Sequence, residues 1–258
     1  MTVRVMRELT RISEHVYWMP PGSPDRPSVC AVAGDRRTLM LDAGSSSAHT
    51  RQVLEALARE HVARPSAVVY THSHWDHVLG GSELDGVVIA QAWTAELLIE
   101  LAARDWSDEG LDRRVAAGQS SALHAEHVKA ELPSPRTVEV VPADIVFRES
   151  IHIDLGGVTV GVRHVGGDHS ADSCVAYVEP DRVLFLGDCL CDSSTGALTS
   201  ELAFPLFDAI LGFDAAIYVE GHHPLISSRT DIESLNQKMR FAARSLLARL
   251  LKRLKASG

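Results

Sequence analysis

Three histidines and one aspartate stand within six residues of one another, directly after an apolar run typical of a buried strand. The segment is Thr71-His72-Ser73-His74-Trp75-Asp76-His77. In an extended chain, side chains two positions apart point the same way, so His72 and His74 can share one ion. A turn at position 75 directs Asp76 and His77 towards another ion. Because imidazole nitrogen and carboxylate oxygen are suitable zinc ligands, the segment predicts a metal site rather than a polar loop with unrelated histidines.

The composition of the chain argues against several classes of function. Its 258 residues are 45% hydrophobic, which is enough to close a substantial core. The formal net charge of −9 would repel phosphate backbones and anionic lipids, so we expect neither a nucleic-acid nor a membrane partner. No apolar run approaches the roughly 20 residues that cross a bilayer, and residues 1–10 contain nothing typical of a signal peptide. We therefore expect a cytoplasmic protein with reduced cysteines and a small-molecule substrate.

Strand and helix patterns alternate around the ligand segment. Strands are expected at 15–19, 28–33, 38–42, 67–71, 87–90, 150–155, 158–164, 173–178, 182–187 and 216–219, and helices at 48–61, 92–104, 199–212 and 230–256. A polar, helical insertion is expected at about 105–132. Strands followed by helices occur twice, which suits two sheets packed face to face with helices outside. We predict a single domain over residues 1–258 that carries this insertion and ends in the helix at about 230–256.

The ligand segment resembles the signature of the metallo-β-lactamase superfamily, H-x-H-x-D-H at the end of a strand. Four further motifs of that superfamily have counterparts here in the same order. They are Leu41-Asp42-Ala43-Gly44, Asp168-His169-Ser170, Phe185-Leu186-Gly187-Asp188 and Glu220-Gly221-His222, so the resemblance spans about residues 12–224. It implies a four-layer αββα sandwich of two mixed β-sheets flanked by helices. It also implies a hydrolase that binds two Zn²⁺ ions, with Fe or Mn as the alternatives.

Seven side chains correspond to the metal ligands of the superfamily. They are His72, His74 and His169 for one ion, Asp76, His77 and His222 for the other, and Asp188 as a bridge between both. Asp76 and Asp188 are then the catalytic residues. Asp76 would orient a hydroxide that the ions share, and Asp188 would bridge the two ions. Asp42 would hold the ligand loops from behind, although an aspartate that caps the turn at Ala43-Gly44 explains it equally well.

Two neighbouring residues leave the ligand assignment open. His223 adjoins His222, and Cys189 adjoins Asp188 at a place where some β-lactamases use a cysteine ligand. We favour His222 and Asp188 because each follows the glycine of its motif and a carboxylate can bridge two ions. Cys191 stands where the lactonase branch commonly has tyrosine, which weakens a lactonase interpretation.

The resemblance predicts a zinc-dependent hydrolase in which a metal-bridging hydroxide cleaves an ester, thioester, lactone or amide bond. The flavin-linked di-iron branch has glutamate where this chain has His74, which favours hydrolysis over oxygen reduction. One alternative is a mononuclear iron oxidoreductase of the persulfide-dioxygenase kind, and another is a true β-lactamase. A nuclease of this fold is disfavoured by the net charge of −9.

The insertion has three roles that the sequence does not separate. It could cover the cleft as a lid, with Trp106, Leu111 and Leu123 contacting substrate, or it could pack on the surface or form a dimer contact, and a homodimer is left open. His124 and His127 lie three apart on one helical face without carboxylate support, so we interpret them as surface or packing residues.

Two apolar residues, Trp18 and Met19, adjoin the proline-rich loop at 20–27. The resemblance places that loop beside the cleft, where both side chains could contact substrate. Core anchoring is the favoured role for both.

Overall fold

Two β-sheets form the centre of the structure, a computed structural model that describes residues 8–190 and 200–241. The seven-stranded sheet has the order β1-β2-β3-β4-β5-β6-β7 and the six-stranded sheet the order β13-β12-β11-β10-β9-β8. The first comprises β1 (Thr10–Arg11), β2 (Val16–Met19), β3 (Val29–Ala33), β4 (Thr38–Leu41), β5 (Ala67–Val69), β6 (Val87–Gln91) and β7 (Ile145–Phe147). The second comprises β8 (Ser150–Asp154), β9 (Thr159–His164), β10 (Cys174–Glu179), β11 (Val183–Gly187), β12 (Ile217–Glu220) and β13 (Ser227–Ser228).

Both sheets are mixed. Strands β1 to β4 run antiparallel to their neighbours, whereas β4 to β7 are parallel and need crossover connections. The second sheet is antiparallel from β8 to β11, and β11 then pairs with β12 in parallel. In the first sheet, the helices between the parallel strands lie on its outer face.

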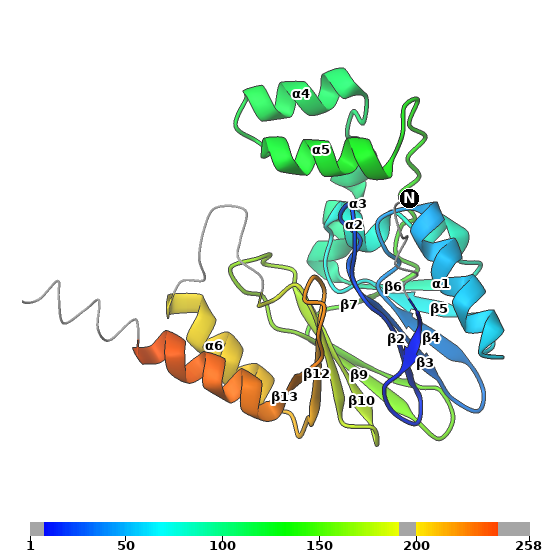
Figure 1. The fold of residues 1–258 in the computed structure, drawn as a ribbon, viewed down its shortest axis with the longest axis vertical. Coiled ribbons are helices and arrows are strands. Elements are labelled where there is room, and N and C mark those ends of the chain that lie inside the picture. Colours follow the sequence, from blue (N-terminus) through cyan, green and yellow to red (C-terminus); the bar gives the residue numbers. More distant parts are fainter. Residues whose placement is uncertain (1–7, 191–199, 242–258) are drawn as a thin grey trace, which may run out of the picture.

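Helices lie on the two outer faces of the paired sheets, and the two helices of the insertion lie together at one end of the molecule (Figure 1). The helices are α1 (Ser47–Arg59), α2 (Trp75–Val78), the 3₁₀ turn η1 (Gly81–Glu83), α3 (Ala92–Ala102), α4 (Asp108–Ala116), α5 (Ala122–Glu131), α6 (Ser200–Leu211) and a helical stretch at 229–241. Helix α1 lies against the seven-stranded sheet, whereas α6 and the stretch at 229–241 lie against the six-stranded sheet (Figure 1). No helix within these described ranges is long and apolar enough to cross a membrane.

Alternating side chains along the strands build three apolar clusters and hence four layers. In β4, Leu39 and Leu41 are buried between the two sheets, and Met40 is buried under α1 and α3. In β10, Ala176 belongs to the inner cluster and Val175 to the outer cluster under α6. Because successive residues of a strand face opposite sides, central strands such as β4 and β10 contribute to two clusters. The predicted αββα sandwich is therefore confirmed.

Most of the predicted elements are found within one or two residues of their predicted ends. The sequence did not indicate β1, β7, β13 or α2, each of which has four residues or fewer. The predicted terminal helix at 230–256 is helical through residue 241, and the rest of that prediction lies outside the described residues.

The insertion forms two helices, α4 and α5, joined at Gly118, whose φ of 68° ends α4. Trp106 and Leu111, which could have contacted substrate from a lid, are buried in the apolar cluster that also contains Leu98 and Leu101 of α3. Leu123 is 60% exposed. Trp18 and Met19 are also buried in the apolar clusters, so their favoured role as core anchors is confirmed.

Candidate metal centre

The predicted ligands lie at the ends of four strands, where both sheets meet. His72 and His74 follow β5, and the short helix α2 that begins at Trp75 carries Asp76 and His77. The others come from the second sheet: His169 from the β9–β10 loop, Asp188 after β11 and His222 after β12. Residues far apart in the sequence are thus brought together by the packing of the two sheets.

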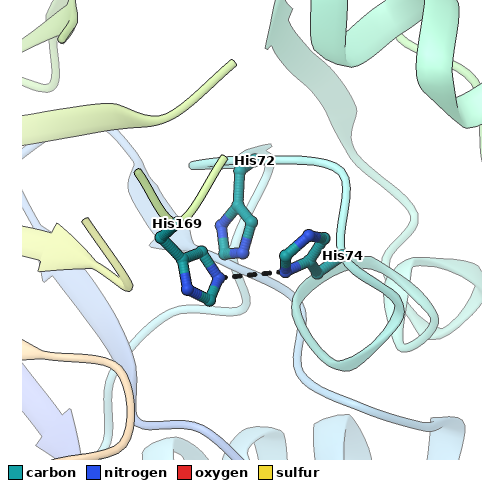
Figure 2. A group of neighbouring side chains, drawn as sticks. All are labelled: His72, His74 and His169. Atoms are coloured by element: carbon teal, nitrogen blue, oxygen red, sulfur yellow. Dashed lines mark hydrogen bonds between the residues drawn. The ribbon is translucent and has the colours of Figure 1, made fainter. Parts of the chain in front are cut away.

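Three of the predicted ligands form the first ligand group, which consists of His72, His74 and His169. One ring nitrogen from each lies within 4.8 Å of the others. Figure 2 shows the three rings arranged around a common space, with His169 Nε2 3.0 Å from His74 Nδ1. Burial, together with the neighbouring imidazoles, lowers the pKa of His72 well below its ordinary value and that of His74 to about 4. These two rings are therefore neutral at pH 7 and can donate a lone pair to a metal.

The remaining four predicted ligands form the second ligand group, which consists of Asp76, His77, Asp188 and His222. One ligand atom from each lies within 4.8 Å of the others. His222 Nε2 lies 3.0 Å from Asp76 Oδ2 and 3.2 Å from Asp188 Oδ2. His77 Nε2 lies 3.4 and 3.3 Å from the same two oxygens. Two imidazoles and two carboxylates thus converge on one point.

The second ligand group has a strongly negative local potential. Burial alone would lower the pKa of His77 and His222, but the carboxylates around them raise it well above its ordinary value for His77 and to about 10 for His222. Burial would raise the pKa of Asp76 and Asp188, but His77 and His222 hold both well below the ordinary range. A doubly charged cation would be stabilised by these ionised carboxylates.

Asp188 lies between the two ligand groups. Its Oδ2 atom is 3.4 Å from His169 Nε2 in the first group and within 3.3 Å of both histidines of the second. This placement is the one that a bridging carboxylate requires.

The donor atoms fit a pair of transition-metal ions. Among the described residues, His72 Nε2, His77 Nε2 and Asp188 Oδ1 are buried and make no hydrogen bond. Buried polar atoms are normally satisfied, and an ion would satisfy these. Nitrogen and carboxylate oxygen are the donors expected for zinc, and also for iron or manganese.

Asp42 lies behind the second ligand group. Its Oδ2 is 2.7 Å from His77 Nδ1, and its Oδ1 accepts a hydrogen bond from the backbone of Thr71 at 2.7 Å. The backbone of Asp42 also has a φ of 60°, in the left-handed region that turns require. Asp42 therefore takes the left-handed conformation at this turn, and its side chain contacts His77, one of the predicted ligands.

The structure also separates the two ambiguous neighbours from the ligand groups. Cys189 is fully buried in the outer apolar cluster. His223 is exposed, and its Nδ1 lies 2.9 Å from the backbone oxygen of Leu225. Cys191, used above against a lactonase interpretation, lies outside the described residues.

One aspartate that the sequence did not indicate joins the two ligand-bearing loops. Asp172 is buried and accepts hydrogen bonds from Ser73 N at 2.9 Å, from Thr94 Oγ1 at 2.9 Å and from the hydroxyl of Ser170. It thereby ties the loop after β5 to α3 and to the loop that carries His169. Its partners are up to 99 positions away, so no local spacing could have indicated it.

A second such residue is Asp25, in the loop at 20–27. It lies 3.5 Å from His222 Nδ1 and 3.1 Å from His127 Nδ1 on α5. His124 packs edge-on against Trp75 with ring centroids 5.9 Å apart. Both insertion histidines are outside the ligand groups, as expected, but they lie beside the site.

Comparison with known proteins relates the chain to metal-dependent hydrolases. The model of the family described as the metallo-beta-lactamase superfamily matches residues 23–248. Over 198 residues the chain is 26% identical to the acyl-coenzyme A thioesterase MBLAC2 of Bos taurus; the match covers 71% of this chain and 66%, just under two thirds, of that protein.

Solved structures share the fold at low sequence identity. A metallo-beta-lactamase from Pontibacter korlensis is similar with a TM-score of 0.61 and 18% identity, over 90% of this chain and 97% of that one. The sec-alkylsulfatase Pisa1 from Pseudomonas sp. is similar with a TM-score of 0.70 and 16% identity, over 95% of this chain and 43% of that one. These structures support the arrangement of the sheets and helices.

Proposed function

The chain belongs to the metallo-β-lactamase superfamily, as a metal-dependent hydrolase, and we propose that it binds two zinc ions and hydrolyses acyl thioesters. The observation that carries this proposal is the position of Asp188 within 3.4 Å of histidines from both ligand groups. Two ions that share a carboxylate are held close enough to act together on one substrate.

The proposed ligands follow the two ligand groups. One ion is assigned to His72, His74 and His169, the other to Asp76, His77 and His222, and both to Asp188. A pair of ions bound by these residues would supply a nucleophilic water at neutral pH and would withdraw electron density from a carbonyl oxygen.

The residues of the site supply orientation and charge for this reaction. The Asp76 carboxylate is ionised, since the neighbouring His77 and His222 outweigh burial and lower its pKa, and it can accept a hydrogen bond from the attacking water. The oxygen of that water would bond to the acyl carbon as the carbon–sulfur bond breaks and the sulfur leaves with the electron pair. The proton of the water would pass along the hydrogen bond to Asp76 and on to the sulfur, which departs as a thiol. Asp42 keeps the ring of His77 in the orientation that its Nε2 needs.

The thioester is favoured over the other bonds for two reasons. The curated relative is named as an acyl-coenzyme A thioesterase. In addition, the β-lactamase alternative with a cysteine ligand requires a thiol in the site, and Cys189 is instead buried in the outer cluster. The mononuclear iron alternative needs one ligand group, whereas this chain assembles two.

A substrate panel tests the proposal. Purified protein loaded with defined zinc is assayed with acyl-coenzyme A thioesters of several chain lengths, aryl esters, lactones and a cephalosporin. We expect the highest kcat/KM for a thioester, loss of activity with a chelator, and recovery with zinc. Faster hydrolysis of a lactone or the cephalosporin than of every thioester would contradict it. Elemental analysis that finds one iron per chain would instead support the dioxygenase alternative.

The setting of the reaction is also part of the proposal. We place a small-molecule substrate in the cytoplasm, consistent with a net charge of −9 that disfavours nucleic acid and anionic membranes. The single domain stays a prediction, which one calorimetric unfolding transition would test. A homodimer stays an open alternative, which a molar mass from light scattering would test.

A further inference from the structure

We propose that Asp25 is a positioning residue for His222, and that His127 on the insertion holds Asp25 in place. The helical insertion would then support the second ligand group directly. This inference rests on the proposed function in one respect, namely that His222 binds a metal.

The two ring nitrogens of His222 face different partners. Nε2 faces the second ligand group, 3.0 Å from Asp76 and 3.2 Å from Asp188. Nδ1 lies 3.5 Å from Asp25 Oδ1. A metal-binding imidazole commonly directs its second nitrogen to a carboxylate, which fixes the ring and makes it a better ligand.

His77 shows the same arrangement with a different carboxylate. Its Nε2 faces Asp76 and Asp188, and its Nδ1 lies 2.7 Å from Asp42. Asp25 thus lies on the same side of His222 as Asp42 does of His77, although at 3.5 Å rather than at the 2.7 Å of the Asp42 hydrogen bond. Both histidines of the second ligand group have a carboxylate behind the ring.

Asp25 is in turn held by helix α5. Asp25 Oδ2 lies 3.1 Å from His127 Nδ1. The next residue, Arg26, forms an ion pair with Glu131 at 2.8 Å, one helical turn beyond His127. The Arg26–Glu131 ion pair and the adjacent contact between Asp25 and His127 therefore fix the loop at 20–27 against one face of α5.

The Arg26 pair and the Asp25 pair differ in their surroundings. The Glu131 side chain is 1% exposed and also accepts a hydrogen bond from Ser46, so this pair can dock the helix by itself. Asp25 and His127 are 24% and 29% exposed, and ion pairs with this exposure contribute little to stability. The Asp25–His127 contact differs from the Arg26 pair in that Asp25 also lies beside His222.

The experiment measures the affinities of the two ions separately, by chelator competition with the full-length zinc protein. The variants are Asp25→Ala, Asp25→Asn and His127→Gln. Controls are Glu126→Gln, an exposed neighbour on α5, and Asp181→Asn, whose partner His15 Nδ1 lies 2.7 Å away at the opposite end of β11. The cobalt-substituted proteins give the absorption spectrum of the metal site as an independent readout.

We expect Asp25→Ala to weaken the second ion about 10- to 100-fold, the range typical of lost partners behind a ligand. The first ion should be unaffected, and the cobalt spectrum should change. Asp25→Asn should recover part of the affinity, because its amide oxygen can still accept a hydrogen bond. His127→Gln should shift the second affinity in the same direction by less, and both controls should leave it unchanged.

Three results would separate the possible failures. Unchanged affinity of the second ion in Asp25→Ala, or equal weakening of both ions, overturns the inference. If His222→Ala weakens the second ion but Asp25→Ala does not, only the inference fails. If His222→Ala has no effect on that ion, the ligand assignment of the proposed function fails instead. Should Asp25→Ala not fold, Asp25→Asn carries the same comparison.

Discussion

The Nε2 atom of His169 lies 3.0 Å from the Nδ1 atom of His74, although 95 positions separate the two residues in the chain. His74 follows a strand of the seven-stranded sheet, and His169 lies between two strands of the six-stranded sheet. The first ligand group therefore spans the junction of the sheets. An ion bound there would contact both halves of the fold.

Removing either of two histidines of this group should have the same effect. His72→Ala and His169→Ala should each lower the metal content by about one ion of the pair and reduce hydrolysis in parallel, because both side chains are assigned to one ion. Elemental analysis and a thioester assay measure this, with His152→Ala, exposed on β8, as the control. Full metal occupancy in either variant would remove that residue from the ligand set.

The adjacent histidines at 222 and 223 should behave differently. His222→Ala removes a ring that lies 3.0 Å from Asp76 and should weaken the second ion and lower kcat. His223→Ala removes an exposed ring that contacts the backbone of Leu225, so metal content should stay unchanged. Metal titration of both variants shows which substitution weakens metal binding more. A larger loss in His223→Ala than in His222→Ala would assign the ligand role to His223.

Asp188 and Cys189 provide a second neighbouring pair. Asp188→Ala should weaken at least one ion and abolish most activity, since the carboxylate contacts both ligand groups. Cys189→Ala should keep both ions and cost on the order of 1 kcal/mol of stability, because it removes one buried atom from the outer core. If loss of the thiol empties a site and Asp188→Ala does not, the chain uses a cysteine ligand and the expected substrates become β-lactams.

Gly221 leaves room for the Asp188 carboxylate. A Cβ atom at this position would lie 1.9 Å from Asp188 Oδ1 and 3.2 Å from His77 Cε1. Gly221→Ala should therefore displace the carboxylate and weaken metal binding, with the far-ultraviolet circular dichroism unchanged. Gly161→Ala is the matched control, because its Cβ would lie 3.3 Å from the exposed ring of His152 and 4.0 Å from the backbone oxygen of Tyr177. Normal metal affinity in Gly221→Ala would show that Asp188 can move without loss of the site.

The contact between Asp181 and His15 should make the free energy of unfolding depend on pH. Burial alone would raise the pKa of Asp181, but hydrogen bonds from Ser13 and His15 lower it below its ordinary value. A carboxyl group whose pKa is lower in the folded state stabilises the fold above its unfolded pKa, about 4, and loses that contribution as the pH falls through the folded pKa. Asp181→Asn should lower the free energy of unfolding by about 1–3 kcal/mol at pH 7. Urea denaturation should show this difference shrinking below about pH 4; an equal difference at every pH would contradict the prediction.

The sequence indicated those features that leave a local pattern. Alternating apolar residues gave the strands, and the spacing of His72, His74, Asp76 and His77 indicated two neighbouring ions. His169, Asp188 and His222 have no such spacing, so only the resemblance of their motifs to a known superfamily could single them out. The four-residue helix α2 was missed because it is too short to show a helical period.

Asp25 and Asp172 show what a single sequence does not reveal. Each is one aspartate in an ordinary polar setting, and its partners become neighbours only when the chain folds. Asp25 lies 102 positions from His127 and 197 from His222, differences that follow directly from their residue numbers. His127 was interpreted as lacking carboxylate support for the same reason, because the supporting carboxylate comes from another part of the chain.

Because each ligand group is divided between the two sheets, its members are synthesised at different times. A chain being synthesised from its N-terminus presents His72, His74, Asp76 and His77 early, together with Asp25 and Asp42. The first group is complete only after His169 has been made, and the second only after His222. Neither of the proposed ions can therefore have its full set of ligands until the strands that carry His169 and His222 have been synthesised.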